Sequence, residues 1–97
     1  MQLSYHPEAE AELIEAARYY EGCMPSLGGQ FLDGLDIAVG KILEDPLRWR
    51  VIEQDVRRYL MLRFPFAIYY RLVPDQLRIL ALKHHSRHPD YWRHRTT

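Results

Sequence analysis

Apolar side chains recur at helical spacing through the first half of the chain and predict two consecutive helices. The first is expected to begin at Pro7, where a missing N–H costs nothing, and to end at Gly22. The second is expected to follow Pro25-Ser26 and to end at Asp45-Pro46, because the residue before a proline avoids helical angles. Its apolar stripe contains Leu27, Phe31, Leu35, Ala38 and Ile42. The two segments predict a helical hairpin.

Glycines interrupt the predicted second helix at four positions, Gly28, Gly29, Gly34 and Gly40. Each glycine costs the helix up to about 1 kcal/mol relative to alanine. Close packing against the first helix or the sheet would explain them, since a residue without a side chain tolerates such an approach. The pattern therefore predicts a tight helix contact at these positions.

The second half of the chain alternates apolar and polar positions in the manner of β-strands. Three strands rich in aromatic and β-branched side chains are expected, at residues 56–62, 66–73 and 77–84. Short connections at Pro65 and Pro74-Asp75 favour antiparallel neighbours. Residues 2–5 predict a short first strand, whereas residues 47–55 are expected to be irregular, with a turn.

Both faces of the predicted sheet carry apolar side chains. In the middle strand, the two faces hold Phe66, Ile68, Tyr70 and Leu72 on one side and Ala67, Tyr69, Arg71 and Val73 on the other. In the last strand, the two sets are Leu77, Ile79 and Ala81 against Arg78, Leu80, Leu82 and His84. We expect the helices to cover one face and leave the other to a partner.

The order of these elements is β-α-α-β-β-β, which predicts an α+β fold. A short N-terminal strand and an antiparallel helical hairpin are expected to pack on a small, mainly antiparallel sheet. Pro89 is expected to open a short C-terminal helical turn carrying Tyr91 and Trp92. A chain of this length predicts one domain over residues 1–97.

Charge is distributed unequally along the chain, although the formal net charge is zero. Residues 1–46 contain nine acidic and two basic side chains, whereas residues 47–97 contain eleven of the thirteen basic side chains and four of the thirteen acidic ones. The C-terminal half also contains four of the five histidines. A basic, aromatic surface of this kind suits a polyanion or an acidic peptide, while the neutral total disfavours strong nonspecific binding to nucleic acid.

Composition and the N-terminal sequence exclude several classes of protein. The apolar share of 47% is typical of a globular domain rather than a disordered one. No apolar run approaches the roughly 20 residues that span a bilayer, and MQLSYHPEAEAE lacks the features of a signal peptide. Cys23 is the sole cysteine, so no internal disulfide forms. A cytoplasmic location is the simplest interpretation.

Several motifs together resemble the RelE/ParE superfamily of bacterial toxins. They are His-Pro-Glu-Ala-Glu at the hairpin, Val-Arg-Arg, Arg-Phe-Pro-Phe, Ile-Tyr-Tyr-Arg, and the closing Ile-Leu-Ala-Leu-Lys-His-His-Ser-Arg-His-Pro-Asp-Tyr-Trp. The resemblance covers residues 2–92 and is most specific at 57–71 and 80–92. It implies the toxin of a type II toxin–antitoxin pair, held inactive by a cognate antitoxin with which it forms a hetero-oligomer.

The superfamily includes toxins that cut messenger RNA on the ribosome and toxins that poison DNA gyrase. Arg58 matches a strand cation of the RelE-like nucleases, but Leu60 stands where the next cation is expected. Ala67 stands where those nucleases carry an arginine before an apolar-apolar-tyrosine run. Loss of such a phosphate contact would cost about 3–4 kcal/mol of transition-state stabilisation. These departures favour the ParE-like branch and a protein that breaks no bond.

The resemblance also assigns candidate site residues under each interpretation. If the chain is a nuclease, the catalytic candidates are Arg58, His85, Arg87 and Tyr91. If the chain acts by binding, the candidates for contact with a partner or target are Arg57, Arg63, Arg71, His84 and Trp92. RelE-like cleavage is metal-free, so neither interpretation requires a metal or another cofactor.

Simpler interpretations apply to some of these residues. The strand arginines can act as solvated charges that protect the sheet edges, and Trp92 suits a lid over the sheet better than a platform for stacking bases. His84 and His88 would share a helical face, but Pro89 disturbs a helix there and disfavours a metal site.

We expect this toxin to inhibit growth by binding a replication target such as DNA gyrase. Ribosome-dependent endoribonuclease activity, which would need no metal, and a degenerate antitoxin-binding member without toxicity are the alternatives. In each case the basic half of the chain predicts an antitoxin segment that is partly acidic and apolar and folds as it binds. The membrane is not an expected partner.

Overall fold

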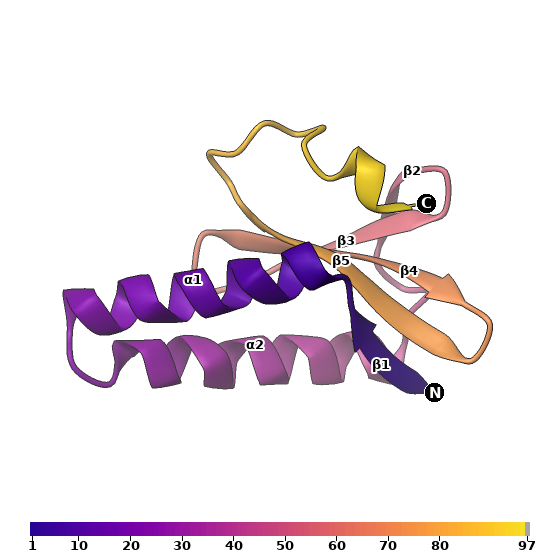
Figure 1. The fold of residues 1–97 in the computed structure, drawn as a ribbon. Helices are drawn as coiled ribbons and strands as arrows, with labels where there is room; N and C mark the ends of the chain where they lie inside the picture. The colour runs from indigo at the N-terminus through magenta and orange to yellow at the C-terminus, as the bar shows by residue number, and fades with distance from the viewer. Residues whose placement is uncertain (97) are drawn as a thin grey trace.

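The computed structural model describes residues 1–96, which form a helical hairpin, a five-stranded sheet and a short C-terminal 3₁₀ helix (Figure 1). The elements in chain order are β1 (Gln2–Tyr5), α1 (Pro7–Cys23), α2 (Leu27–Glu44), β2 (Arg50–Glu53), β3 (Val56–Leu60), β4 (Phe66–Val73), β5 (Gln76–His84) and η1 (Arg93–Thr96). The predicted α+β fold and its element order are confirmed, with one additional strand, β2.

Local capping fixes the bounds of the two helices. The Nδ1 atom of His6 accepts a hydrogen bond from the backbone N–H of Glu8 at 3.1 Å, and Pro7 occupies the first helical position. At the hairpin turn, the Glu21 carboxylate accepts hydrogen bonds from the N–H groups of Ser26 and Gly28, each at 3.0 Å. A carboxylate at the first turn of α2 also complements the helix dipole. Glu21 therefore joins the two helices and caps the second.

Only Gly28 has the close contact that the sequence predicted for all four glycines of α2. A Cβ atom at Gly28 would lie 2.5 Å from the backbone carbonyl oxygen of Ala17. At Gly34 it would make ordinary contacts with Phe64 and Met61, and at Gly29 and Gly40 it would meet nothing within 4 Å. The packing explanation is therefore correct at Gly28 and wrong at Gly29 and Gly40.

The sheet has the order β1-β5-β4-β3-β2, in which β1 is parallel to β5 and the other neighbours are antiparallel. Strand β2 falls within the segment expected to be irregular, because a positive φ of 51° at Gln54 turns the chain back onto β3. A register shift between Val51 and Glu53 breaks the alternation that would have revealed this strand. β3 also ends at Leu60, two residues earlier than expected.

A bulge changes the predicted facing of β5. The register passes from Tyr69↔Ala81 to Tyr70↔Ile79, so Leu80 is the extra residue on its strand. Leu77, Ile79 and Leu82 consequently pack with the helices, while Leu80 and Ala81 lie on the opposite face. The predicted grouping of Ala81 with Leu77 and Ile79 is wrong for this reason.

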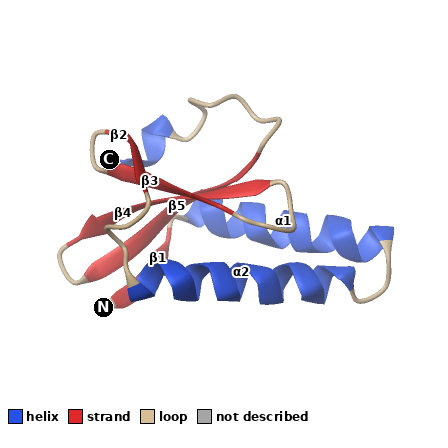
Figure 2. Cartoon of the chain, turned by 180° about the vertical axis from the view of Figure 1, so that it is seen from behind, coloured by secondary structure: helices blue, strands red, loops and turns tan. Residues whose placement is uncertain are grey.

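The two faces of the sheet are covered by different parts of the chain. Figures 1 and 2 show α1 and α2 lying side by side on one face, with the C-terminal segment crossing the other. On that second face Trp92, 2% exposed, packs with Val56, Ala67, Tyr69, Leu80 and Ala81. Trp92 therefore covers the sheet, as the simpler interpretation predicted. The expected helical turn carrying Tyr91 and Trp92 instead begins after them, at Arg93.

Among the helices of residues 1–96, none combines the length and the apolar character needed to cross a membrane.

The glycines of α2 give a direct test of the hairpin packing. Gly28→Ala is expected to lower the free energy of unfolding by about 1–3 kcal/mol, because the added methyl group meets the backbone of α1. Gly40→Ala is the matched control and is expected to raise it by up to about 1 kcal/mol through helix propensity. Urea denaturation followed by circular dichroism measures both changes. Equal effects at the two positions would contradict the packing described for Gly28.

Candidate functional site

Glu12, on α1, attaches the C-terminal segment to the helix and to the edge of the sheet. Its Oε1 atom accepts hydrogen bonds from the backbone N–H of Leu82 at 3.1 Å and from Nη1 of Arg95 at 2.7 Å. Its Oε2 atom accepts from the Tyr91 hydroxyl at 2.6 Å and from Nη2 of Arg95 at 3.2 Å. Because Arg95 is buried and ion-paired at 2.7 Å, this contact is protected from solvent screening.

Arg95 completes the arrangement at the edge of β5. Its Nη1 atom donates to the carbonyl oxygen of Leu80 at 3.1 Å, and its Nε atom lies 3.4 Å from the Glu8 carboxylate. Strand β1 pairs with β5 only as far as Ile79. Beyond that point, Glu12 and Arg95 bind the Leu82 N–H and the Leu80 carbonyl in place of a neighbouring strand.

Tyr91 is held between two guanidinium groups and a carboxylate. The Cζ atoms of Arg87 and Arg95 lie 4.1 and 4.8 Å from its ring centroid. Burial, followed by the hydrogen bond to Glu12 and the charge of that carboxylate, raises the pKa of the Tyr91 hydroxyl above its ordinary value. Tyr91 therefore keeps its hydroxyl proton at neutral pH and donates it in a hydrogen bond to Glu12.

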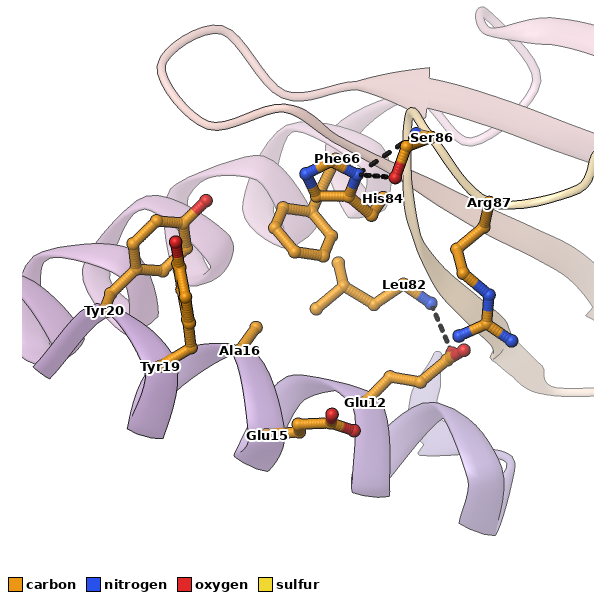
Figure 3. Close-up of a pocket in the computed structure, with 10 residues that line it drawn as sticks. All are labelled: Glu12, Glu15, Ala16, Tyr19, Tyr20, Phe66, Leu82, His84, Ser86 and Arg87. Atoms are coloured by element: carbon orange, nitrogen blue, oxygen red, sulfur yellow. Dashed lines mark hydrogen bonds between the residues drawn. The ribbon is translucent and has the colours of Figure 1, made fainter. Parts of the chain in front are cut away.

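A cavity of about 360 Å³ lies between α1 and the end of β5 (Figure 3). Glu12, Glu15, Ala16, Tyr19, Tyr20, Phe66, Leu82, His84, Ser86 and Arg87 line it. Figure 3 shows side chains of α1 facing those of β5 and of the segment that follows it. Aromatic and aliphatic walls with charges of both signs suit an amphipathic peptide better than a small polar metabolite.

His84, a predicted contact residue, is held inside this cavity. Its Nδ1 atom lies 2.7 Å from the Ser86 hydroxyl and accepts a hydrogen bond from the Ser86 backbone N–H at 3.1 Å. The imidazole ring also meets the Phe66 ring edge-on, with centroids 5.1 Å apart. These contacts fix the orientation of the ring at the wall of the cavity.

Lys83 is a site residue that the sequence argument did not identify. It is 7% exposed, and its Nζ atom donates to the carbonyl oxygen of His84 at 3.2 Å. Burial, followed by the charges of Arg58 and Arg87, lowers the pKa of its ammonium group. The structure therefore brings two of the four nuclease candidates together around a lysine. The feature that could have identified Lys83 from the sequence is its position in the last strand, opposite Ala67.

The remaining predicted residues are dispersed over the molecule. Arg57 faces the helices and donates to the carbonyl oxygens of Leu47 and Trp49, at 3.0 and 2.7 Å. Arg63 lies exposed in the β3–β4 connection, with its guanidinium 5.1 Å from the ring centroid of Phe64.

Arg71 and His85 lie at different ends of the sheet. Arg71 binds Asp55 at 2.9 Å and the carbonyl oxygen of Thr96 at 2.7 Å, which ties it to the C-terminal segment. His85 is exposed, and its backbone N–H donates to the carbonyl oxygen of Pro65 at 2.9 Å. Arg57, Arg71 and His85 therefore do not share a site with Lys83.

The part of the chain described, residues 1–96, contains no group of three or more His, Cys, Asp or Glu side chains that could hold a metal ion. The histidines after β5 make local contacts instead, since Nδ1 of His88 accepts a hydrogen bond from the Asp90 backbone N–H at 3.1 Å.

The helical hairpin covers one sheet face, as expected, whereas the C-terminal segment and Trp92 cover the centre of the other face, which was expected to be left to a partner. A family model described as "ParE toxin of type II toxin-antitoxin system, parDE" matches residues 3–89. The chain belongs to this ParE toxin family and is a toxin of the type II toxin–antitoxin class.

Solved structures show the same fold. One chain of the structure titled "Chromosomal ParDE TA system from P. aeruginosa" is 18% identical, with a TM-score of 0.76. The match covers 87% of the present chain and 95% of that chain, and at this identity the likeness concerns the fold. Among curated protein sequences, none matches this chain significantly.

The hydrogen bond between Tyr91 and Glu12 is expected to contribute to stability. Tyr91→Phe is expected to lower the free energy of unfolding at pH 7 by about 1–2 kcal/mol, since a partly buried hydrogen bond to a carboxylate is lost while Glu12 keeps its other donors. Tyr59→Phe is the control, because the Tyr59 hydroxyl makes no hydrogen bond within residues 1–96. Its free energy of unfolding is expected to change by less than about 0.5 kcal/mol.

The raised pKa of Tyr91 also predicts a pH dependence. The folded state retains this proton more tightly than the unfolded state, so its contribution is complete below the ordinary tyrosine pKa of 10.0 and is lost as pH rises above it. Stability of the native chain should fall above pH 10 more steeply than that of the Tyr91→Phe variant. Urea titrations between pH 7 and 11 measure the difference, and parallel curves would contradict this role of Tyr91.

Proposed function

We propose that this toxin arrests growth by binding DNA gyrase and that a cognate antitoxin neutralises it by covering its C-terminal half. The observation that carries the proposal is the cross-strand row Leu60–Ala67–Lys83, on the face that a RelE-like nuclease would use. Two of its three positions lack a cation, and the third holds a buried lysine with a lowered pKa.

The surroundings of Tyr91 also favour binding over RNA cleavage. A nuclease needs a group that takes the 2′-hydroxyl proton, donors for the phosphate and an acid for the leaving oxygen. The Tyr91 hydroxyl donates to Glu12 and has a raised pKa, while His85 lies exposed on its own. Missing phosphate donors cost about 10²–10³ in rate each, so this arrangement is a poor catalyst of cleavage.

The cavity beside His84 and the exposed Arg63 are the proposed points of contact with protein partners. Both lie on the surface, and Tyr19 at the cavity is 66% exposed. Arg57 and Arg71 are proposed to contribute through the shape and charge of the sheet. The Trp92 side chain is buried between the C-terminal segment and the sheet, so it would contact a partner only if that segment moved away from the sheet. A gyrase target implies action in the cytoplasm.

The decisive experiment compares gyrase and messenger RNA as targets of the same purified protein. We expect inhibition of gyrase supercoiling, with accumulation of cleaved DNA, at toxin concentrations that leave transcripts intact in a translating extract. Addition of the antitoxin should restore supercoiling. Transcript cleavage with unaffected gyrase would replace the proposed target by the ribosome, and absence of both effects would indicate a member that only binds an antitoxin.

Expression without antitoxin tests the same proposal in cells. DNA synthesis is expected to fall before protein synthesis, because gyrase poisoning stops replication first, and labelled thymidine and methionine report the two rates. His85→Ala should leave the arrest unchanged, since a binding toxin does not need that exposed side chain as a proton carrier. Early loss of protein synthesis that His85→Ala abolishes would instead identify a nuclease.

A further inference from the structure

Lys83 is a buried cation whose charge has no partner in the described part of the chain. It is 7% exposed, and no carboxylate within residues 1–96 forms an ion pair with it. Its single hydrogen bond goes to the carbonyl oxygen of the next residue, His84, at 3.2 Å. Buried charges in proteins are normally paired and fully hydrogen-bonded, so this arrangement is incomplete.

The groups around Lys83 increase this imbalance. Arg58 and Arg87 both lie close enough to disfavour its charged form, and both are positively charged themselves. Within residues 1–96 the side chains of Arg58 and Arg87 form no hydrogen bond or ion pair, and the Arg87 guanidinium lies 4.1 Å from the Tyr91 ring centroid. Glu12 lines the same cavity as Arg87, but its two oxygens already accept four hydrogen bonds.

The register explains how these groups come together. Lys83 on β5 is opposite Ala67 on β4, which in turn is opposite Leu60 on β3. Leu60, Ala67 and Lys83 therefore share one face of the sheet, where Ala67, 3% exposed, packs with Trp92. Arg58 lies two residues before Leu60 and on the same face, opposite Tyr69. Lys83 and Arg58 therefore lie on the same face of the sheet, and the charges of Arg58 and Arg87 both act on the Lys83 ammonium group.

We infer that Lys83, Arg58 and Arg87 form a socket for a carboxylate side chain of the antitoxin, which supplies the missing negative charge. A carboxylate accepts up to four hydrogen bonds, and these three side chains offer unused N–H donors. The inference rests on the proposed neutralisation by an antitoxin and names the point at which an acidic residue enters.

Two observations favour a peptide carboxylate over a nucleic-acid phosphate. Because Lys83 is only 7% exposed, a single glutamate or aspartate side chain suits it better than the bulky phosphate backbone of a duplex. Leu60, in the same row, is 51% exposed, and Leu62 just beyond the strand is 89% exposed. Exposed leucines in this row and next to it suit an apolar peptide, whereas a phosphate backbone would gain nothing from them.

The test compares antitoxin binding by charge-neutral variants of the toxin. The probe is the antitoxin polypeptide that abolishes growth arrest on co-expression, titrated calorimetrically against purified toxin. Lys83→Met is expected to weaken binding about 30-fold or more, because the antitoxin carboxylate is left buried without its partner. Arg58→Met and Arg87→Met should also weaken it. Arg18→Met removes one exposed charge from α1 and is the control, with a change below about 3-fold.

The stability of the free variant toxin is measured separately, and the direction in which its thermal midpoint changes tests the inference. Removing an unpaired buried charge should leave the thermal midpoint of free Lys83→Met toxin unchanged or higher. A lower midpoint would mean that the lysine serves the fold, which would overturn the socket. Unchanged antitoxin affinity in Lys83→Met, or an equal loss in Arg18→Met, would overturn it as well.

The carboxylate itself is identified by double-mutant cycles. Each Asp or Glu of the antitoxin is changed to Asn or Gln and combined with Lys83→Met. The inference predicts one position whose loss is not additive with that of Lys83→Met. Additive losses of affinity at every acidic position would refute the inference. Binding of a single-stranded DNA 12-mer to the toxin is measured as a second probe. If Lys83→Met weakens binding of this DNA but not of the antitoxin, the inference is also refuted.

The gyrase target and the socket can fail independently. Normal antitoxin binding that depends on Lys83, in a toxin without effect on gyrase, would support the socket and refute the target. Inhibition of gyrase with no antitoxin binding to the native toxin would refute both the proposed neutralisation and the socket.

Discussion

The ion pair between Glu12 and Arg95 is the interaction on which the arrangement of the functional surface depends. It connects α1 to the C-terminal segment and also satisfies two backbone groups of β5 where β1 no longer reaches. A free sheet edge exposes unpaired N–H and C=O groups that can bind other chains. Closing this edge with side chains rather than with a strand leaves the adjoining cavity open and holds Tyr91 and Arg87 beside it.

The two faces of the sheet carry separate buried clusters. On the helical face, Phe31, Ile42 and Ile68 are fully buried and form the main core. On the other face, Trp92 packs with a second buried cluster, and Lys83 lies toward the end of β5. Substitutions of buried residues on either face therefore act on folding.

Helices and central strands were predictable because local patterns determine them. The stripe from Leu27 to Ile42 and the alternation in β4 recur in the structure with nearly the expected bounds. Strand β2 was not predictable, since it is four residues long and its pairing contains a register shift. The bulge at Leu80 was equally hidden, because both faces are apolar there and the alternation gives no warning.

The candidate site was less predictable than the fold for a related reason. Arg58 and Arg87 were identified from their chemistry, but Lys83 becomes notable only when its burial and its missing counterion are known. Arg57 and Arg71 are also arginines, on β3 and β4, yet their guanidinium groups are occupied by backbone oxygens and Asp55. Sequence identifies the cations, whereas the fold decides which of them are available to a partner.

The parallel pairing of β1 with β5 has a consequence for the order of events during translation. Gln2 pairs with Gln76 and Tyr5 with Ile79, so the N-terminal strand has no neighbour until the ribosome has made most of the sheet. At about 5–20 residues per second, roughly 2–7 s separate synthesis of the end of α2 from that of Ile79. During this interval the apolar face of the helical hairpin has no sheet to cover it. The nascent toxin is therefore most exposed to chaperones and proteases before its basic surface exists.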